Sequence, residues 1–109
     1  MRRGDIVTAA FPGDYGKPRP AIVIETDLLP GTDSVLLCLI TSKVREEVVQ
    51  RRILLEPSAE NGLHVRSQCA LEKIVAVKRT RCGDLIGRLD KSSLDRLNEG
   101  LALVVGLLD

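Results

Sequence analysis

Several residue types are scarce in this chain, and each scarcity excludes a class of protein. The sequence has one histidine and three widely spaced cysteines. A structural zinc site therefore has almost no ligands to draw on, and an odd number of distant cysteines is no disulfide framework. No apolar run approaches the roughly 18 residues of a membrane span, and the N-terminal residues lack the apolar stretch of a signal peptide. We therefore expect a cytoplasmic protein without metal, cofactor or membrane contact.

What the chain does have is the composition of a folded domain. Hydrophobic residues make up 44% of the 109 residues and charged residues 28%, values typical of folded proteins, and this length predicts a single domain over residues 1–109. The net charge of +1 is unevenly spread: residues 64–81 carry five basic residues and one acidic residue, and residues 84–109 carry three basic and five acidic residues. The basic segment is suited to follow the phosphates of a nucleic acid, although an ordinary solvated surface also explains it.

The first three quarters of the sequence are typical of β-structure. Five short apolar runs are separated by turn signals such as Pro12-Gly13 and Pro30-Gly31. The runs cover residues 6–11, 21–24, 35–40, 53–55 and 69–77. The run at 35–40 is apolar on both faces, which predicts a central strand that is covered on each side. Five such strands predict a small closed or nearly closed β-barrel.

The last part of the sequence changes its period. One helical stripe contains the apolar residues Leu94, Leu97, Leu101, Val104, Val105 and Leu108. Asp90, Ser92 or Ser93 can cap the N-terminus of this helix. Gly100 inside it costs about 1 kcal/mol relative to alanine, which indicates close packing at that position.

Two short stretches carry residues suited to chemistry on a phosphate. Arg19 stands between Pro18 and Pro20, and the following proline pushes its backbone toward extended geometry. A guanidinium held stiffly in this way suits bidentate contact with a phosphate. Thr41 and Ser42 follow directly on an apolar strand, where polar donors at a sheet end often build a site. Each stretch also has a plainer interpretation: an arginine beside prolines that prevent edge pairing, and a strand end that hydrogen-bonds its own turn.

Six short motifs occur here in the order and spacing of a known family. They are Arg3-Gly4-Asp5-Ile6-Val7, Arg19-Pro20-Ala21-Ile22-Val23, Ile40-Thr41-Ser42, Asn61-Gly62-Leu63 with Ser67, Glu72-Lys73-Ile74 and Ile86-Gly87-Arg88-Leu89. Each is weak alone, but together they span nearly the whole chain, and the sequence resembles the MazF/PemK toxins. The resemblance implies a mainly β fold with a C-terminal helix, the small SH3-like barrel of CcdB- and MazF-like toxins, assembled as a homodimer. It also implies the toxin of a type II toxin–antitoxin system: a sequence-specific endoribonuclease (mRNA interferase) that cleaves single-stranded RNA without a metal ion and arrests growth.

The resemblance assigns roles to individual residues. The family's catalytic arginine, which precedes proline at the start of the second strand, corresponds to Arg19, and its catalytic threonine, at the end of the next long strand, corresponds to Thr41. In cleavage by the RNA's own 2′-OH, Arg19 would neutralise the charge that develops on the phosphate, and Thr41 would donate a hydrogen bond to it. The residues expected to contact RNA are Tyr15, Lys17, Ser42 and Ser67. Of these, Tyr15 would stack on a base or, alternatively, pack on the barrel.

Two further ionisable residues receive different interpretations. We interpret His64, the only histidine, as an exposed turn residue and not as a general base, because it matches no catalytic position of the family. Glu72 lies in an apolar strand, where a carboxylate needs partners, and we expect it to be structural and to pair with an arginine at the dimer interface. The groups that move the protons stay open, because threonine is a poor base and a guanidinium, which keeps its proton in proteins, is a demanding general acid.

Two other functions are open to the same fold. A gyrase-poisoning toxin would act by binding, but relatives of that kind rely on an aromatic residue at the C-terminal end, and this chain has no tryptophan. A barrel that binds nucleic acid without cutting it would not need Arg19 and Thr41 together.

The resemblance also implies a protein partner. This is a cognate antitoxin whose acidic, disordered C-terminal tail folds on binding. We expect the tail to cross a basic surface near Arg19, Lys73 and Arg79 and to compete with RNA. The groove would lie between two subunits and be lined by the strand of Glu72 and the loop of Tyr15.

Overall fold

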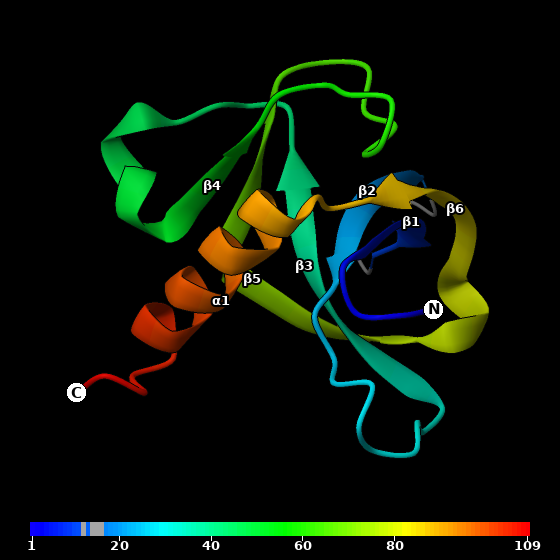
Figure 1. Ribbon diagram of the computed structural model, residues 1–109. Helices are drawn as coiled ribbons and strands as arrows, with labels where there is room; N and C mark the ends of the chain where they lie inside the picture. Colours follow the sequence, from blue (N-terminus) through cyan, green and yellow to red (C-terminus); the bar gives the residue numbers. More distant parts are fainter. Residues whose placement is uncertain (12, 14–16) are drawn as a thin grey trace.

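The computed structural model describes residues 1–11, 13 and 17–109, which form one six-stranded antiparallel sheet and a C-terminal helix (Figure 1). The strands are β1 (Asp5–Ala10), β2 (Pro18–Val23), β3 (Ser34–Thr41), β4 (Arg52–Leu55), β5 (Ser67–Lys78) and β6 (Cys82–Arg88). The 3₁₀ helices η1 (Glu46–Arg51) and η2 (Arg79–Arg81) and the helix α1 (Lys91–Val104) complete the fold. The mainly β fold with a C-terminal helix is thus confirmed. In the described part of the chain no helix is long and apolar enough to cross a membrane.

The strand order is β4-β5-β3-β2-β1-β6, so that β4 and β6 are the edges of a strongly curled sheet (Figure 1). The expectation of five strands is wrong, because β6 has no apolar run to reveal it. Gly83 and Gly87 interrupt the apolar pattern of β6, and both allow another segment to lie close to the strand. A Cβ added at Gly83 would lie 2.6 Å from the hydroxyl of Thr8, and one added at Gly87 would lie 2.5 Å from the carbonyl oxygen of Asn61. Glycine in a strand marks such contacts.

Apolar residues fill both faces of the sheet, because successive side chains of a strand point to opposite sides. The cluster beneath α1 includes Ile6, Ile22, Cys38, Ile40, Leu71 and Leu97. The cluster on the other face includes Val7, Ala21, Val23, Val35, Leu37 and Val77. The expected central strand is therefore covered on both faces, except at Leu36, which is 42% exposed. Cys38 and Cys69 are buried, as small hydrophobes should be.

The start of α1 and its packing follow the sequence closely. Of the three expected capping residues it is Asp90 that caps the helix, and its carboxylate accepts a hydrogen bond of 3.1 Å from the backbone N–H of Ser93. Gly100 faces β5, where a Cβ would overlap the side chain of Leu71. The close packing expected at this glycine is confirmed.

The end of α1 differs from the prediction. The apolar stripe runs on to Leu108, but the helix ends at Val104. Gly106, with a φ of +81°, turns the chain, and the N–H of Leu107 donates to the carbonyl of Ala102 over 2.9 Å. This Schellman arrangement satisfies the last helical carbonyls and stops the helix despite the continuing pattern.

The first half of β2 leaves the sheet open on one side. Residues 18–20 pair with β1, whereas only Ala21–Val23 pair with β3. Pro18 and Pro20 fit here, because a proline lacks the N–H that a central strand would donate on that side. The sheet thus has a gap between the start of β2 and the end of β3, and the candidate site lies there.

Candidate active site

A cavity of about 500 Å³ occupies the gap between β2 and β3, within the range typical of ligand sites. Three segments and one strand line it: residues 17 and 19–20, residues 40–42, residues 62–65 with Ser67, and Ile86 of β6. The connection between β4 and β5 arches past the tip of β3 toward β2 and forms one wall (Figure 1).

Five of the residues expected at the site line this one cavity. They are Lys17, Arg19, Thr41, Ser42 and Ser67. Tyr15, the other expected RNA contact, lies outside the described residues. Although these five are spread over some fifty positions of the sequence, antiparallel pairing and one loop bring them together.

Strand register explains why Arg19 and Thr41 meet. Ala21 pairs with Leu39 in the β2–β3 ladder, and the same register carried two residues further sets Arg19 opposite Thr41, on the same face of the sheet. The ladder has ended at this point. The two side chains therefore stand across an open gap in which a ligand can be held by both.

The hydroxyls of Thr41 and Ser67 make different hydrogen bonds. Thr41 Oγ1 accepts a hydrogen bond of 3.1 Å from the N–H of Lys43, so the strand end does bond its own turn, and the hydroxyl hydrogen is left to donate. Ser67 is buried, and its hydroxyl donates to the carbonyl of Val65 over 2.9 Å. Its hydrogen is thus committed to holding the loop and not to a ligand.

The cavity is cationic. Lys17 and Arg19 are both exposed, and no carboxylate stands among the described residues that line it. A concave site with one sign of charge concentrates ligands of the opposite sign. The arrangement suits a phosphate chain.

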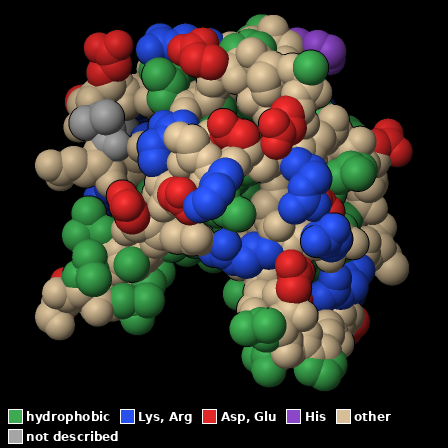
Figure 2. All heavy atoms as spheres, in the orientation of Figure 1, with side chains coloured by type: hydrophobic (Ala, Val, Ile, Leu, Met, Phe, Trp, Pro, Cys, Tyr) green, Lys and Arg blue, Asp and Glu red, His purple; other side chains and the backbone are tan. Residues whose placement is uncertain are grey.

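The wider basic surface expected from the sequence is not continuous. Arg79 lies at the other end of β3, where its N–H donates to the carbonyl of Asp33, and its guanidinium pairs with Glu25 at 2.9 Å. On the face shown in Figure 2, acidic and basic side chains are interspersed. Within one chain, β5 thus carries Arg79 away from the cavity of Arg19, and an antitoxin tail that crosses both residues stays a prediction.

Asn61 holds the loop that walls the cavity. Its side chain is buried; the oxygen accepts from the N–H groups of Ser58 and Leu63, both at 3.0 Å, and the nitrogen donates to the carbonyl of Glu56 over 2.8 Å. Next to it, Gly62 (φ +68°) lies so close to the carbonyl of Ile86 that no Cβ would fit. The loop is thereby fixed against β6.

His64 is displayed from this loop. It is exposed, as expected of a turn residue, but it also lines the cavity of Arg19 and Thr41, and Figure 2 shows the histidine side chain standing at the surface. The sequence held no signal for this position, because the loop has no regular pattern and its path over the cavity depends on Asn61 and β6.

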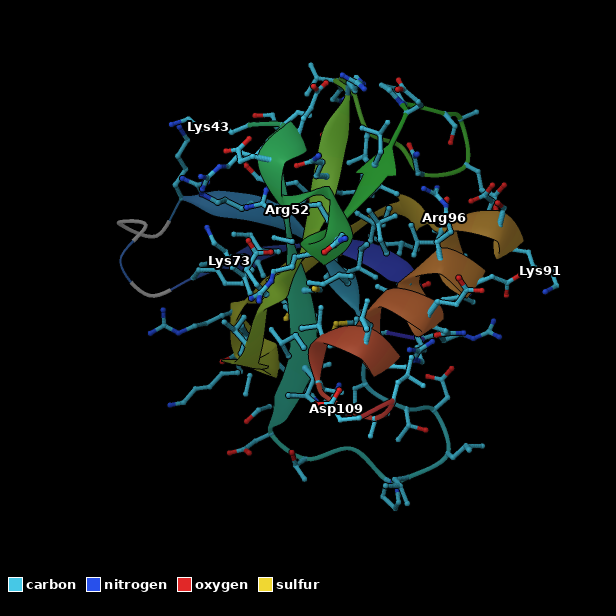
Figure 3. All side chains as sticks on the ribbon, turned by 90° about the vertical axis from the view of Figure 1, so that its left-hand side faces the viewer. Lys43, Arg52, Lys73, Lys91, Arg96 and Asp109 are labelled. Atoms are coloured by element: carbon cyan, nitrogen blue, oxygen red, sulfur yellow. The ribbon has the colours of Figure 1, made fainter. Side chains whose placement is uncertain are left out.

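Glu72 pairs within its own chain. Arg52, labelled in Figure 3, reaches from β4 to β5 and donates to Glu72 at 2.8 Å through Nη2, and through Nη1 to Gln68 at 3.3 Å. The Arg52 side chain is only 3% exposed. Partial burial alone would raise the pKa of Glu72, but the hydrogen bonds and charge of Arg52 outweigh it and the pKa is lowered. Glu72 pairs with an arginine as expected, and this arginine belongs to the same chain; that the pair lies at a dimer interface stays a prediction.

A second cavity, of about 390 Å³, lies along the first half of the same loop. Its charged lining residues are Glu56, Glu60, Asp90 and Arg96. Hydrogen bonds from the side chain and N–H of Ser93 hold the pKa of Asp90 below its ordinary value. Nowhere in the described residues do three His, Cys, Asp or Glu side chains come together as a group able to hold a metal ion.

A small curled β-sheet with a cationic cavity at the open junction of two strands is an arrangement suited to an anionic ligand. Comparison with known proteins makes this specific. The chain belongs to the family of PemK-like, MazF-like toxins of type II toxin–antitoxin systems, whose model matches residues 2–105. The resemblance inferred from the sequence motifs is confirmed.

Individual relatives agree with this family. The chain is 35% identical over 108 residues to a probable endoribonuclease MazF of Mycolicibacterium smegmatis, covering 98% of each chain. Its fold is similar to that of a mycobacterial endoribonuclease solved in complex with its cognate antitoxin (TM-score 0.82, 17% identity, 98% and 96% of the two chains). It is also similar to the Mycobacterium tuberculosis toxin MazF-mt6 (TM-score 0.79, 22% identity, 94% and 96%). These findings lend no support to the gyrase-poisoning alternative.

Proposed function

We propose that this chain is the toxin of a type II toxin–antitoxin pair and an endoribonuclease that cuts single-stranded RNA at specific sequences without a metal ion. The observation that carries the proposal is that Arg19 and Thr41 line the same cationic cavity. Family membership and the likeness to a probable endoribonuclease support it.

Cleavage begins with attack of the RNA's own 2′-OH on the adjacent phosphorus. The transition state carries extra negative charge on the nonbridging oxygens, and Arg19 neutralises it. Thr41, whose hydroxyl hydrogen is left to donate, hydrogen-bonds the same phosphate and fixes it for in-line attack. Removing one preorganised donor of this kind typically costs about 10²–10³ in rate.

The remaining contacts position the RNA. Lys17 and Ser42 face the same cavity and bind flanking phosphates, which fixes the register of the strand without reading its sequence. Ser67 acts indirectly by holding the loop through Val65. Tyr15, outside the described residues, is proposed to stack on a splayed base.

Cleavage of a long single-stranded RNA in the presence of EDTA tests this function. Mapped products should end in a 2′,3′-cyclic phosphate and a 5′-OH, because the 2′-OH is the nucleophile. A 2′-deoxy nucleotide placed just before the mapped cut should block cleavage at that site. RNA that is bound but never cut would show a binding protein, and undiminished cutting of the deoxy substrate would exclude the mechanism.

We further propose a homodimer and an antitoxin partner. The structural neighbour that was solved with its cognate antitoxin supports the partner. An acidic, disordered C-terminal tail would fold over the cavity of Lys17 and Arg19 and compete with RNA, and salt would slow its association by screening the charges. Sedimentation of an active monomer would contradict the dimer, and an antitoxin that binds tightly without weakening RNA binding would contradict the shared site.

A further inference from the structure

The proposed reaction requires a group that accepts the proton of the 2′-OH, and the cavity offers few. Lys17 and Arg19 are cations, and a guanidinium is not deprotonated in proteins. Thr41 and Ser42 are hydroxyls and poor bases. Among the described lining residues, His64 alone has a side chain that is ordinarily an unprotonated acceptor near neutral pH.

The position of His64 complements that of the phosphate-binding pair. In an in-line displacement the attacking and leaving oxygens lie at opposite ends of the phosphorus, and the charged oxygens lie around its middle. A base for the attacking oxygen must therefore approach from another side than the groups that bind the charged oxygens. Arg19 and Thr41 come from β2 and β3, and His64 comes from the loop that forms the other wall.

The loop presents this histidine from a short stretch that is tied at both ends. On one side of His64, the N–H of Leu63 donates to Asn61 at 3.0 Å, and on the other side the carbonyl of Val65 accepts from Ser67 at 2.9 Å. A catalytic group is effective when its support is fixed before the substrate arrives.

We propose that His64 is the general base of RNA cleavage, an inference that rests on the proposed function and that replaces the interpretation from the sequence, because His64 lines the cavity of Arg19 and Thr41. Its imidazole takes the proton of the 2′-OH as the 2′-oxygen forms a bond to phosphorus and the bond from phosphorus to the 5′-oxygen breaks. The 5′-oxygen takes a proton from water, and the imidazolium later returns its proton to solvent. The products are the cyclic phosphate and the 5′-OH end.

Among the described residues, the charged groups that line the cavity with His64 are Lys17 and Arg19. On its own loop, Arg66 is paired with Glu56 at 3.0 Å. Arg66 does not line the cavity, so that Arg66→Ala is a matched control on the same loop.

Cleavage rates of an RNA with a single cut site, measured from pH 5 to pH 8, test the role of His64. In the wild type the rate should fall toward acid as the imidazole becomes charged. The cleavage rates of His64→Ala and His64→Gln should be lower by about 10²-fold or more, and these rates should no longer fall toward acid (the acidic limb of the pH profile). Added imidazole should restore part of the cleavage rate of His64→Ala. Arg66→Ala should keep both rate and limb. A His64→Ala rate near that of the wild type, with its acidic limb intact, overturns the inference.

Two further experiments identify which proton transfer is catalysed and which residue catalyses it. An RNA with a sulfur in place of the 5′-oxygen needs no proton on its leaving group, so it should not rescue His64→Ala; rescue would make His64 the acid and overturn its assignment as base. Asp14, in the part of the chain outside the described residues, is the competing carboxylate: loss of the acidic limb in Asp14→Asn alone also overturns the inference. Absence of any cut by the wild type defeats the proposed function itself, which separates the two failures.

Discussion

The two cavities along the β4–β5 loop have similar volumes, about 500 and 390 Å³, but opposite charge. One faces Lys17 and Arg19 without a carboxylate among its described lining residues, and the other contains three carboxylates and Arg96. Volume alone does not indicate which cavity binds RNA. The sign of the charge does, because the cations of the first cavity attract a phosphate chain and the carboxylates of the second repel it.

The two cavities also differ in what their polar groups already do. In the second cavity, Asp90 caps α1, and Arg96 (Figure 3) donates to the carbonyl of Leu54 at 3.3 Å and to the hydroxyl of Ser93 at 3.1 Å. These groups hold α1 to the sheet. In the first cavity the hydroxyl hydrogen of Thr41 is left to donate. The first cavity therefore keeps a hydroxyl hydrogen that the fold does not use, whereas the side chains of Asp90 and Arg96 in the second are engaged by the fold.

The largest expected effect on cleavage comes from replacing one arginine in each cavity and comparing the two variants. Arg19→Ala should lower the cleavage rate by about 10²-fold or more, because the missing charge acts on the transition state. Arg96→Ala should leave the rate unchanged. Both variants should keep the circular dichroism spectrum of the folded protein. Equal loss in the two variants would remove the distinction between the cavities.

Next in size is the effect of the hydroxyls at the end of β3. Thr41→Val is nearly isosteric and should lower the cleavage rate at least about tenfold, because it removes the hydrogen bond to the phosphate. Ser42→Ala should lose less. The two single-turnover rates measure this directly, and the reverse ranking would assign the catalytic hydroxyl to Ser42.

A smaller effect on cleavage is expected at Asn61, which lines the second cavity and holds the loop that walls the first. Asn61→Ala removes three side-chain hydrogen bonds of a buried residue, and the unpaired groups should cost about 1–3 kcal/mol in the free energy of unfolding. Because the stretch around His64 loses its anchor, cleavage should fall several-fold as well. Urea unfolding and initial rates check the two parts. Lost stability with undiminished cleavage would show that the loop need not be held for activity.

The smallest effect on cleavage is expected outside both cavities. Glu72→Gln should lower stability by about 1–3 kcal/mol at pH 7, because buried Arg52 loses its charged partner, and should leave cleavage unchanged. The pKa of Glu72 is lowered in the fold, so its contribution is present above the unfolded-state pKa and lost as the pH falls through the folded-state value. Urea midpoints of wild type and variant should therefore converge in acid; a difference that stays constant would contradict the ion pair.

The sequence sufficed where short motifs and strand pairing determine the outcome. Arg19 and Thr41 meet because the β2–β3 register is set by apolar runs that are visible in the sequence. Asp90 and Gly100 likewise act as their local chemistry predicts. These features depend on neighbouring residues or on one strand pair.

Features that depend on distant contacts could not be predicted. The apolar pattern of β6 is interrupted by glycines that allow close contact with Thr8 and Asn61. The end of α1 depends on the backbone of Gly106 and not on the apolar stripe. His64 reaches the cavity only because Asn61 folds its loop over β6. For β6 and for the loop of His64 the deciding contact is with a segment far away in the sequence, where a side-chain pattern carries no signal, whereas the helix stop is signalled by Gly106 itself and is masked by the apolar stripe that continues past it.

Titration with an uncleavable RNA tests the central claim most directly. The RNA should carry the mapped cut sequence with a 2′-O-methyl group at the nucleotide before the cut, which keeps every phosphate but removes the nucleophile. Amide signals of residues 17, 19, 40–42 and 62–65 should shift in nuclear magnetic resonance spectra, and those of residues 56–60, 90 and 93 should not. Shifts concentrated on the second cavity, around Glu60 and Arg96, would contradict the assignment of RNA cleavage to the cavity of Arg19 and Thr41.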